Sequence, residues 1–494
     1  MTKLAERRRL RIPGPRPTAI AAYVAVLVAY LLVGLSVSSD PSLTAAYGVI
    51  AVCALSIAIL GLRSPVDKSD PLVWMNIAFA VMFGLHPIAM IETGVLEQAY
   101  HFRFFLVPTY PQAAALALLA TISFNLGYWI HRASTRGGAG ISALPLLHSG
   151  SEAVDLLRSR LASRLAWLTL LVSLVAYSAF AISVGTNPIA AILGGARRGE
   201  ETSSTAYLYY APQMIGPATL LFLYAALIRR KFPLGAVVLG AVQLILFLPG
   251  GQRLVLLLTL VPTFLAYFML QRKRLATGLL VAGTLPILTL VIAMRDLGAN
   301  VELDIFSAVA RFVSNPQEQL LEFATGDDTE MLDALAVELQ LVPSAIPHSP
   351  LSVLTSTLAA PIPSAFWSGK PQPADSLLNA IIVGTDANSA GLAYSFVGEL
   401  FYDSSYFGVI IGFLVAGAIA AGSRDWVRRA QSPATILIYC ALVPTFISLV
   451  RGSLAYALAR ALFTVGPLVA YSIVERRRLS SLYAADNRSQ KVMS

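Results

Sequence analysis

Apolar runs of about 20 residues recur along the chain, from 18–37 near its start to 454–474 near its end. A helix that crosses a bilayer needs about 20 mainly apolar residues. Hydrophobic residues make up 56% of the 494 residues and charged residues only 13%, whereas soluble domains are roughly 45–50% apolar and about 25% charged. The sequence therefore predicts an all-α polytopic membrane protein.

Hydrophobicity places twelve spans along the chain. The predicted spans are 18–37, 44–62, 71–92, 112–131, 165–185, 207–228, 232–249, 253–270, 275–294, 404–422, 434–450 and 454–474. The first run is long and lacks a clear small-residue cleavage site, so we interpret it as a retained helix rather than a signal peptide.

The predicted organisation has five parts. They are a basic cytoplasmic tail over 1–17, nine spans within 18–294, an extracytoplasmic loop domain over 295–403, three spans within 404–474 and a second basic cytoplasmic tail over 475–494.

The distribution of Lys and Arg sets the orientation. With both termini in the cytoplasm, 27 of the 36 Lys and Arg residues fall on the cytoplasmic segments, which is the expected bias. The formal net charge of +9 then reflects topology and contact with anionic membrane lipids rather than nucleic-acid binding. Cys53 and Cys440 lie inside apolar runs, so we interpret neither as a disulfide partner or a metal ligand.

Nine cations remain on the outer side, and eight of them are arginine. They are Arg103, Arg197, Arg198, Arg253, Arg295, Arg311, Lys370, Arg451 and Arg460. Arginine presents a planar fork of donors that matches phosphate oxygens in pairs. Because Arg253, Arg295 and Arg451 lie near outer span ends and Arg460 lies about two turns inside the last span, the set indicates a pocket for a phosphate-bearing lipid head group.

Simpler interpretations of these arginines stay open. A single arginine at a helix end usually extends its charge to the membrane interface and does nothing else; we assign Arg103 and Arg311 to that group. Arg197 and Arg198 could pair with the glutamates of the sequence GEE that follows them.

The outer loop over 295–403 is too long for a structureless connection. Helical spacing of apolar residues predicts two short amphipathic helices at the membrane face, broken near Gly326, whose acidic residues form a solvated face. Further along, His348 is either a solvated loop residue or a general base. Glu399 and Asp403 are four residues apart, on one helical face, where they could act as base and positioner or as counter-ions to the arginines.

Four motifs in a fixed order carry a family resemblance. They are GGQRLVLLL at 250–258, PIPSAFWSGKPQ at 361–372, SFVGELFYDSSYFGVIIGFLVAG at 395–417 and VRGSLAYAL at 450–458. With the twelve-span layout, they make the chain resemble the O-antigen and oligosaccharide repeat-unit polymerases of bacterial envelopes, the Wzy-type membrane glycosyltransferases.

The resemblance implies a GT-C-like fold shared with O-antigen ligases, and action on the outer face of the bacterial cytoplasmic membrane. The donor would be a glycan on polyprenyl pyrophosphate, the acceptor another lipid-linked repeat unit, and a chain-length regulator protein a possible partner. It implies that Arg253 and Arg451 hold the pyrophosphate, that Glu399 sits at the reacting centre and that Lys370 lies in a loop closing over the site.

The chemistry of the residues agrees with these implications. Cleavage of a sugar–pyrophosphate bond builds charge on the leaving oxygens, which fixed guanidinium groups can stabilise. No Asp-x-Asp or clustered His and Asp set occurs in the outer loops, so we expect no metal and no cofactor. The acceptor hydroxyl needs a base, for which Glu399 and His348 are the candidates.

Rival functions remain. An O-antigen ligase would differ only in its acceptor. A transporter or flippase of an anionic lipid-linked glycan would also use buried arginines, but no inverted repeat or pair of broken helices is visible. A dolichol-phosphate-type transferase would need an acidic pair in the first outer loop, where Asp40 stands alone. An acyltransferase would need a catalytic histidine on an early span; we interpret the available His86 as structural.

Overall fold

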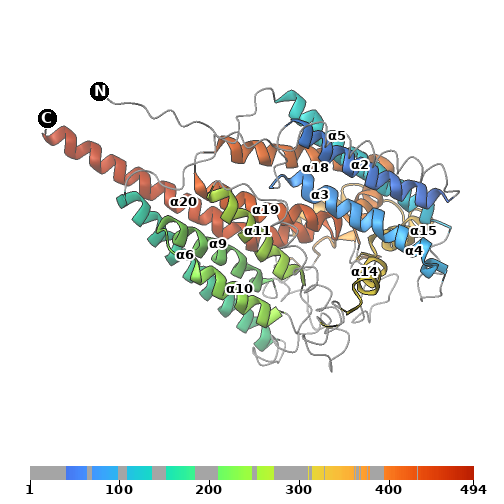
Figure 1. The fold of residues 1–494 in the computed structure, drawn as a ribbon, viewed down its shortest axis with the longest axis horizontal. Helices are drawn as coiled ribbons and strands as arrows, with labels where there is room; N and C mark the ends of the chain where they lie inside the picture. The colour runs from blue at the N-terminus through green and yellow to red at the C-terminus, as the bar shows by residue number, and fades with distance from the viewer. Residues whose placement is uncertain are drawn as a thin grey trace.

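The computed structural model describes residues 40–63, 69–97, 108–135, 152–183, 210–247, 253–271, 314–326, 329–360, 394–430 and 432–493, with short pieces between 310 and 378. Within these residues all regular secondary structure is helical (Figure 1). The helices are α2 (Pro41–Arg63), α3 (Pro71–Phe79), π-helical η1 (Ala80–Leu85), α4 (His86–Glu92), η2 (Val95–Glu97), α5 (Tyr110–Ser134), α6 (Glu152–Ser183), η6 (Ala211–Met214), α9 (Ile215–Ile228), α10 (Leu234–Phe247), α11 (Arg253–Leu270), α14 (Pro316–Thr325), α15 (Met331–Leu341), α16 (Ser352–Ala359), α18 (Phe396–Arg429), α19 (Pro433–Val450) and α20 (Leu454–Met493).

Eight helical segments of the described part are long and apolar enough to cross a membrane. They coincide with eight of the twelve predicted spans, which makes the chain a polytopic α-helical membrane protein. Shorter apolar helices, Leu234–Gln243 and Leu257–Leu270, lie within the predicted spans 232–249 and 253–270. The predicted spans 18–37 and 275–294 lie outside the described residues.

The helices form two packed groups (Figure 1). Buried apolar side chains of α2, α3, α5, α15 and α18 make one core, and those of α6, α9, α11, α19 and α20 make the other. Because α19 also contributes Phe446, Leu449 and Val450 to the first core, it holds the two groups together.

Two glycines let α5 and α18 approach closely. A Cβ atom added at Gly127 would lie 2.1 Å from the carbonyl oxygen of Leu414, and one added at Gly417 would lie 2.0 Å from that of Phe124. Small residues at such crossings allow helix backbones to pack against each other inside membranes. These glycines therefore fix how α18, which carries much of the candidate site, sits in the bundle.

The bundle has two ends of different chemistry. The last turns of α5, α9 and α18 lie toward the same end of the bundle. This end carries Arg132, Arg229, Arg428 and Arg429, and we term it the basic end. The opposite end, termed the loop end, holds the end of α4, the starts of α18 and α20, and α14 to α16. Figure 1 shows α4, α14 and α15 gathered there, far from the C-terminal part of α20.

The two predicted loop helices exist as α14 and α15, with the break at Gly326 as expected. Their environment differs from the prediction. Helix α15 packs against α5 and α18, so Asp333 and Glu338 are buried, at 4% and 1% exposure. The prediction of a fully solvated acidic face is therefore wrong for these two residues, because α15 is part of the core and not a surface helix.

Helix α18 is broken at Ser404 and Ser405, whose backbone angles are not helical. We call the segment before the break, 396–403, the head of α18. Gly408 follows the break, and a Cβ there would lie 2.3 Å from the carbonyl oxygen of Leu400. The head thus folds closely against the membrane-crossing part of its own helix, at the position where the sequence predicts span 404–422 to begin.

Candidate functional site

Glu399 lies on the head of α18 and is 3% exposed. Its Oε2 atom accepts a hydrogen bond of 2.7 Å from the backbone N–H of Leu454, the first residue of α20. Ser453 completes this helix start by accepting from the N–H of Tyr456 at 3.1 Å. A helix start has unpaired N–H groups and favours negative charge, so the Glu399 carboxylate joins the head of α18 to α20.

A second buried acid lies against the head of α18. A Cβ added at Gly398 would lie 1.8 Å from Oε2 of Glu338, so the Glu338 carboxylate occupies the space beside this glycine. Glu338 therefore packs against Gly398, the residue directly before Glu399. Sequence reasoning missed Glu338, because it was grouped with solvated acids; the glycine directly before Glu399 was the only local signal.

His348 is half-buried beside the same head. Its Nδ1 atom lies 3.3 Å from the carbonyl oxygen of Tyr402, and its ring meets Phe401 edge to face. Because a carbonyl only accepts, the contact requires the proton on Nδ1, which leaves a lone pair on Nε2 in the neutral ring. The head of α18 thus positions both predicted bases, Glu399 and His348.

Asp403 is the last residue of the head, and its carboxylate binds the start of α16. Its Oδ1 atom accepts hydrogen bonds from the N–H of Val353 at 3.1 Å and from the hydroxyl of Ser352 at 3.3 Å. The carboxylate thus provides an acceptor for donors in the first turn of α16. Asp403 and Glu399 therefore both lie on the head of α18, but their carboxylates bind different helices.

Two predicted arginines lie near the start of α20. Arg451 is half-buried and follows the last residue of α19, three residues before Leu454. Arg460 is half-buried on α20, with its guanidinium 5.7 Å from the ring centre of Tyr210. Its buried Nε has no hydrogen-bond partner among the described residues, and a buried donor without a partner is costly.

The other predicted site residues are less defined. Arg253 is the first residue of α11, but its side chain lies outside the described part of the structure. Arg197, Arg198 and Arg295 lie wholly outside the described residues. Lys370 donates from Nζ to the carbonyl oxygens of Ala360 and Ile362, at 3.1 and 3.0 Å, and burial lowers its pKa. In this arrangement it closes the C-terminal end of α16. The described residues contain no group of three His, Cys, Asp or Glu side chains that could hold a metal ion.

His86, the first residue of α4, connects this helix to α14 and α15. Its Nδ1 lies 2.7 Å from the carbonyl oxygen of Ala324, and its Nε2 lies 3.1 Å from Oδ1 of Asp333. The two ring nitrogens thus contact a backbone carbonyl of α14 and a carboxylate of α15. The fully buried ring ties α15, which carries Glu338, to α4, in agreement with a structural role.

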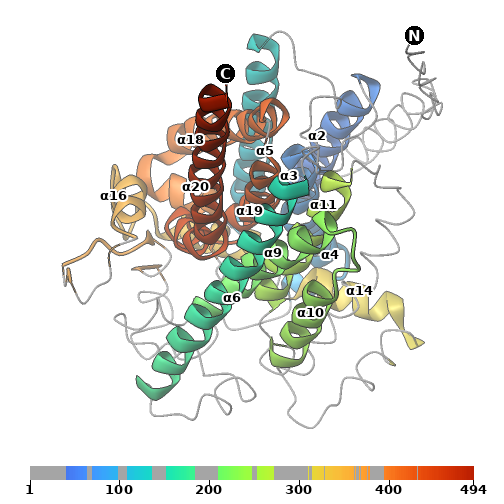
Figure 2. The same ribbon diagram turned by 90° about the vertical axis from the view of Figure 1, so that its left-hand side faces the viewer.

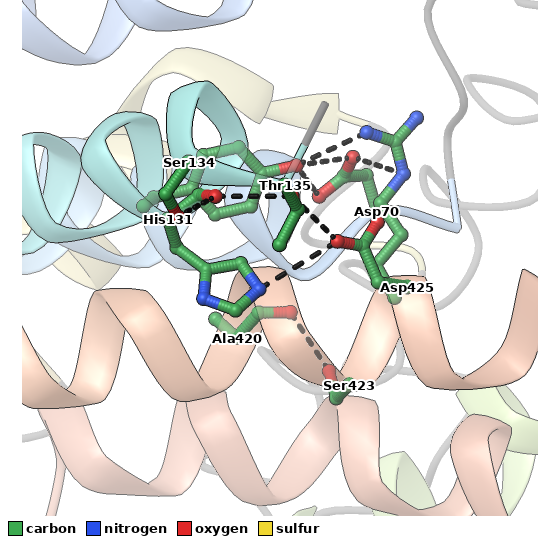
Figure 3. A network of polar contacts seen from close by, with 9 residues as sticks. Asp70, His131, Ser134, Thr135, Ala420, Ser423 and Asp425 are labelled. Carbon is green, nitrogen blue, oxygen red and sulfur yellow. Dashed lines mark hydrogen bonds and ion pairs between the residues drawn. The ribbon is translucent and has the colours of Figure 1, made fainter. Parts of the chain in front are cut away.

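A separate polar cluster lies at the basic end (Figure 3). Arg424 is 2% exposed inside α18, and its Nε lies 2.8 Å from Oδ2 of the fully buried Asp70. The Tyr128 hydroxyl donates to the same carboxylate at 2.7 Å, and His131 and Asp425 lie beside it, 3.6 Å apart. Arg424 was predicted in a cytoplasmic connection, but α18 continues to Arg429, so Arg424 locks α3, α5 and α18 together.

Residues 379–477 match the model of a family described as O-antigen polysaccharide polymerase Wzy. The matched segment contains the head of α18, α19 and the start of α20, and hence Glu399, Arg451 and Arg460. No curated protein and no solved structure matches the chain significantly. The match in the C-terminal region supports a Wzy-type polymerase family for this chain.

Proposed function

We propose that the protein polymerises polyprenyl-pyrophosphate-linked oligosaccharide repeat units into a surface polysaccharide. The reaction takes place at the loop end, on the outer face of the bacterial cytoplasmic membrane. Two observations support this: the family match over 379–477, and the gathering of arginines at the opposite, basic end, which is typical of the cytoplasmic side.

The observation that carries the proposal is the bond between Glu399 and Leu454. It draws together two motifs that are 55 residues apart, GELFYD on the head of α18 and VRGSLAY at the start of α20. An acid, an arginine-bearing turn and His348 are thereby held at one junction of helices, within or beside the segment matched to the polymerase family.

The reaction is a displacement at the anomeric carbon of the donor. A hydroxyl oxygen of the acceptor sugar forms a bond to this carbon, and the bond from the carbon to the pyrophosphate oxygen breaks. Polyprenyl pyrophosphate leaves with the electron pair, and the hydroxyl proton passes to a base. His348 suits this step through Nε2, whereas one oxygen of Glu399 is already bound to a backbone N–H.

In the proposed site the arginines stabilise the leaving group. Arg451, Arg460 and Arg253 supply donors to the pyrophosphate oxygens as their charge develops, without a metal. Among the described residues, Nε of Arg460 has no hydrogen-bond partner, so it could donate to such a ligand. Arg197, Arg198, Arg295 and Lys370 are proposed to extend the binding surface for the glycan and its pyrophosphate.

The test uses a strain that lacks the protein and carries the wild type, Glu399→Gln or Arg429→Met. Glutamine retains an oxygen that can accept from Leu454 but removes the charge, so the helix junction is preserved. Arg429 is exposed at the basic end and provides the control. Envelope polysaccharide is separated on a gel, and the amount of each variant in the membrane is measured by immunoblot.

A polymer ladder with the wild type and Arg429→Met, and single repeat units with Glu399→Gln, would support the proposal. Full-length polymer that accumulates on the lipid carrier in the strain lacking the protein would show a ligase instead. An unchanged ladder in that strain would reject both transferases.

A further inference from the structure

Helix α16 exposes a purely apolar face at the loop end. Leu354 and Leu358 are 53% and 67% exposed, whereas Val353 and Ser356 on the other side of the helix are buried. No Asp, Glu, Lys or Arg occurs between Glu338 and Lys370, although the rest of the loop is rich in acids. Such a stretch without charge is suited to contact with hydrocarbon.

Both ends of α16 are closed by charged side chains. Asp403 accepts from the first groups of the helix, and Lys370 donates to the carbonyl oxygens of Ala360 and Ile362 at its end. Where water is scarce, backbone groups at helix ends must find partners within the protein. These two contacts give α16 the terminal hydrogen bonds that it needs at a membrane.

The position of α16 is continuous with a lipid-facing surface. After the break at Ser404 and Ser405, α18 exposes Phe407 (76%), Ile411 (60%) and Ile419 (57%) at helical spacing. Helix α16 contacts both α18 and α20, and Figure 2 shows it at the outer edge of the bundle beside them. Aromatic residues follow it, with Phe366 at 85% exposure, as is common at membrane interfaces.

We propose that α16 is an interfacial helix whose Leu354 and Leu358 lie among the lipid chains of the leaflet at the loop end. The helix fixes the membrane surface at the level of the head of α18, because Asp403 binds the two directly. Glu399 and His348 then lie at the depth of lipid head groups. The inference concerns membrane contact and does not depend on the proposed reaction.

The test measures the accessibility of nitroxide labels on the full chain in phospholipid nanodiscs. Labels are attached through Leu354→Cys, Leu358→Cys and Thr355→Cys; Thr355 is exposed at the polar margin of the same helix. The native Cys53 and Cys440 are buried, and the unmodified chain controls for their labelling. Collision rates are compared for oxygen, which concentrates in lipid, and a water-soluble nickel complex.

We expect labels at 354 and 358 to collide more with oxygen than with nickel, and the label at 355 to show the reverse preference. Nickel preference at all three sites would overturn the proposal, since α16 would then stand in water. Low collision with both reagents at 354 and 358 would also overturn it, because a protein segment or partner would then cover the leucines.

Discussion

Neutralising one member of the buried pair Asp70 and Arg424 should destabilise the protein strongly. Asp70→Asn keeps an acceptor for the N–H of Leu72 and for Tyr128, but it leaves the Arg424 guanidinium charged and buried. Arg424→Met fills similar space and leaves the Asp70 carboxylate charged and buried. Removing one partner of a buried ion pair costs about 3–5 kcal/mol.

The double variant should recover most of this loss. With both charges removed, no ion is buried without a counter-ion, and replacement of a whole buried pair is often neutral or stabilising. The two single losses should therefore not add. With about 3–5 kcal/mol lost in each single variant and little lost in the double variant, the coupling free energy of the cycle should be about 6–10 kcal/mol. Arg429→Met, on the exposed side of the same helix, should change stability by no more than about 0.5 kcal/mol.

The free energies come from reversible unfolding of the purified protein in mixed micelles, followed by helical circular dichroism for the wild type, the two single variants, the double variant and the control. A loss of less than about 1 kcal/mol in the free energy of unfolding of each single variant would be typical of a solvent-exposed ion pair. That result, or losses that simply add, would refute the description of this cluster as a buried lock between α3, α5 and α18.

Two further substitutions test the loop end. Gly398→Ala places a methyl group against the buried Glu338 carboxylate and should lower the free energy of unfolding by about 1–3 kcal/mol through overpacking. Gly466→Ala, where a Cβ meets nothing within 4 Å, is the control and should not destabilise the protein in the same unfolding assay. Equal effects of the two variants would contradict the contact between Gly398 and Glu338. His86→Leu leaves the buried Asp333 carboxylate without the imidazole ring as a partner, so amide hydrogen exchange should accelerate in α15 and not in α19. Unchanged protection of the α15 amides would show that the contact between His86 and Asp333 does not hold α15 in place.

Much of the membrane architecture follows from the sequence, because crossing a bilayer imposes length and hydrophobicity on each helix. The positions of α2, α5, α19 and the other long apolar helices were predicted on that basis, and the break at Gly326 followed from local backbone preference. These are properties of a short window of sequence, and they require no knowledge of which helices touch.

The buried polar contacts could not be predicted in the same way. Asp333 and Glu338 look like solvated acids in a window of sequence, and only the packing of α15 into the first core makes them buried. Arg424 looks like a cytoplasmic charge because apolar residues end before it, yet Asp70 supplies a counter-ion from a helix more than 350 residues away. Pairing across such distances depends on tertiary packing.

The candidate site shows both cases. Its candidate residues were chosen from the sequence, since an acid and several arginines at the predicted outer ends of spans are unusual. The bond from Glu399 to Leu454 was not evident, because it depends on the sharp break at Ser404 and Ser405 that folds the head of α18 against the bundle.

The most direct test of the proposed site is polymerisation by the purified protein in liposomes, with isolated polyprenyl-pyrophosphate-linked repeat units as the only substrate. The wild type should form a ladder of polymer and release one polyprenyl pyrophosphate for each repeat unit added. Arg451→Met should lower the rate by about 10²–10³-fold, the usual cost of losing one donor to a developing charge. Glu399→Gln should leave single repeat units without a ladder. Ladder formation by both variants at rates within about tenfold of the wild type would contradict a site built on these two residues.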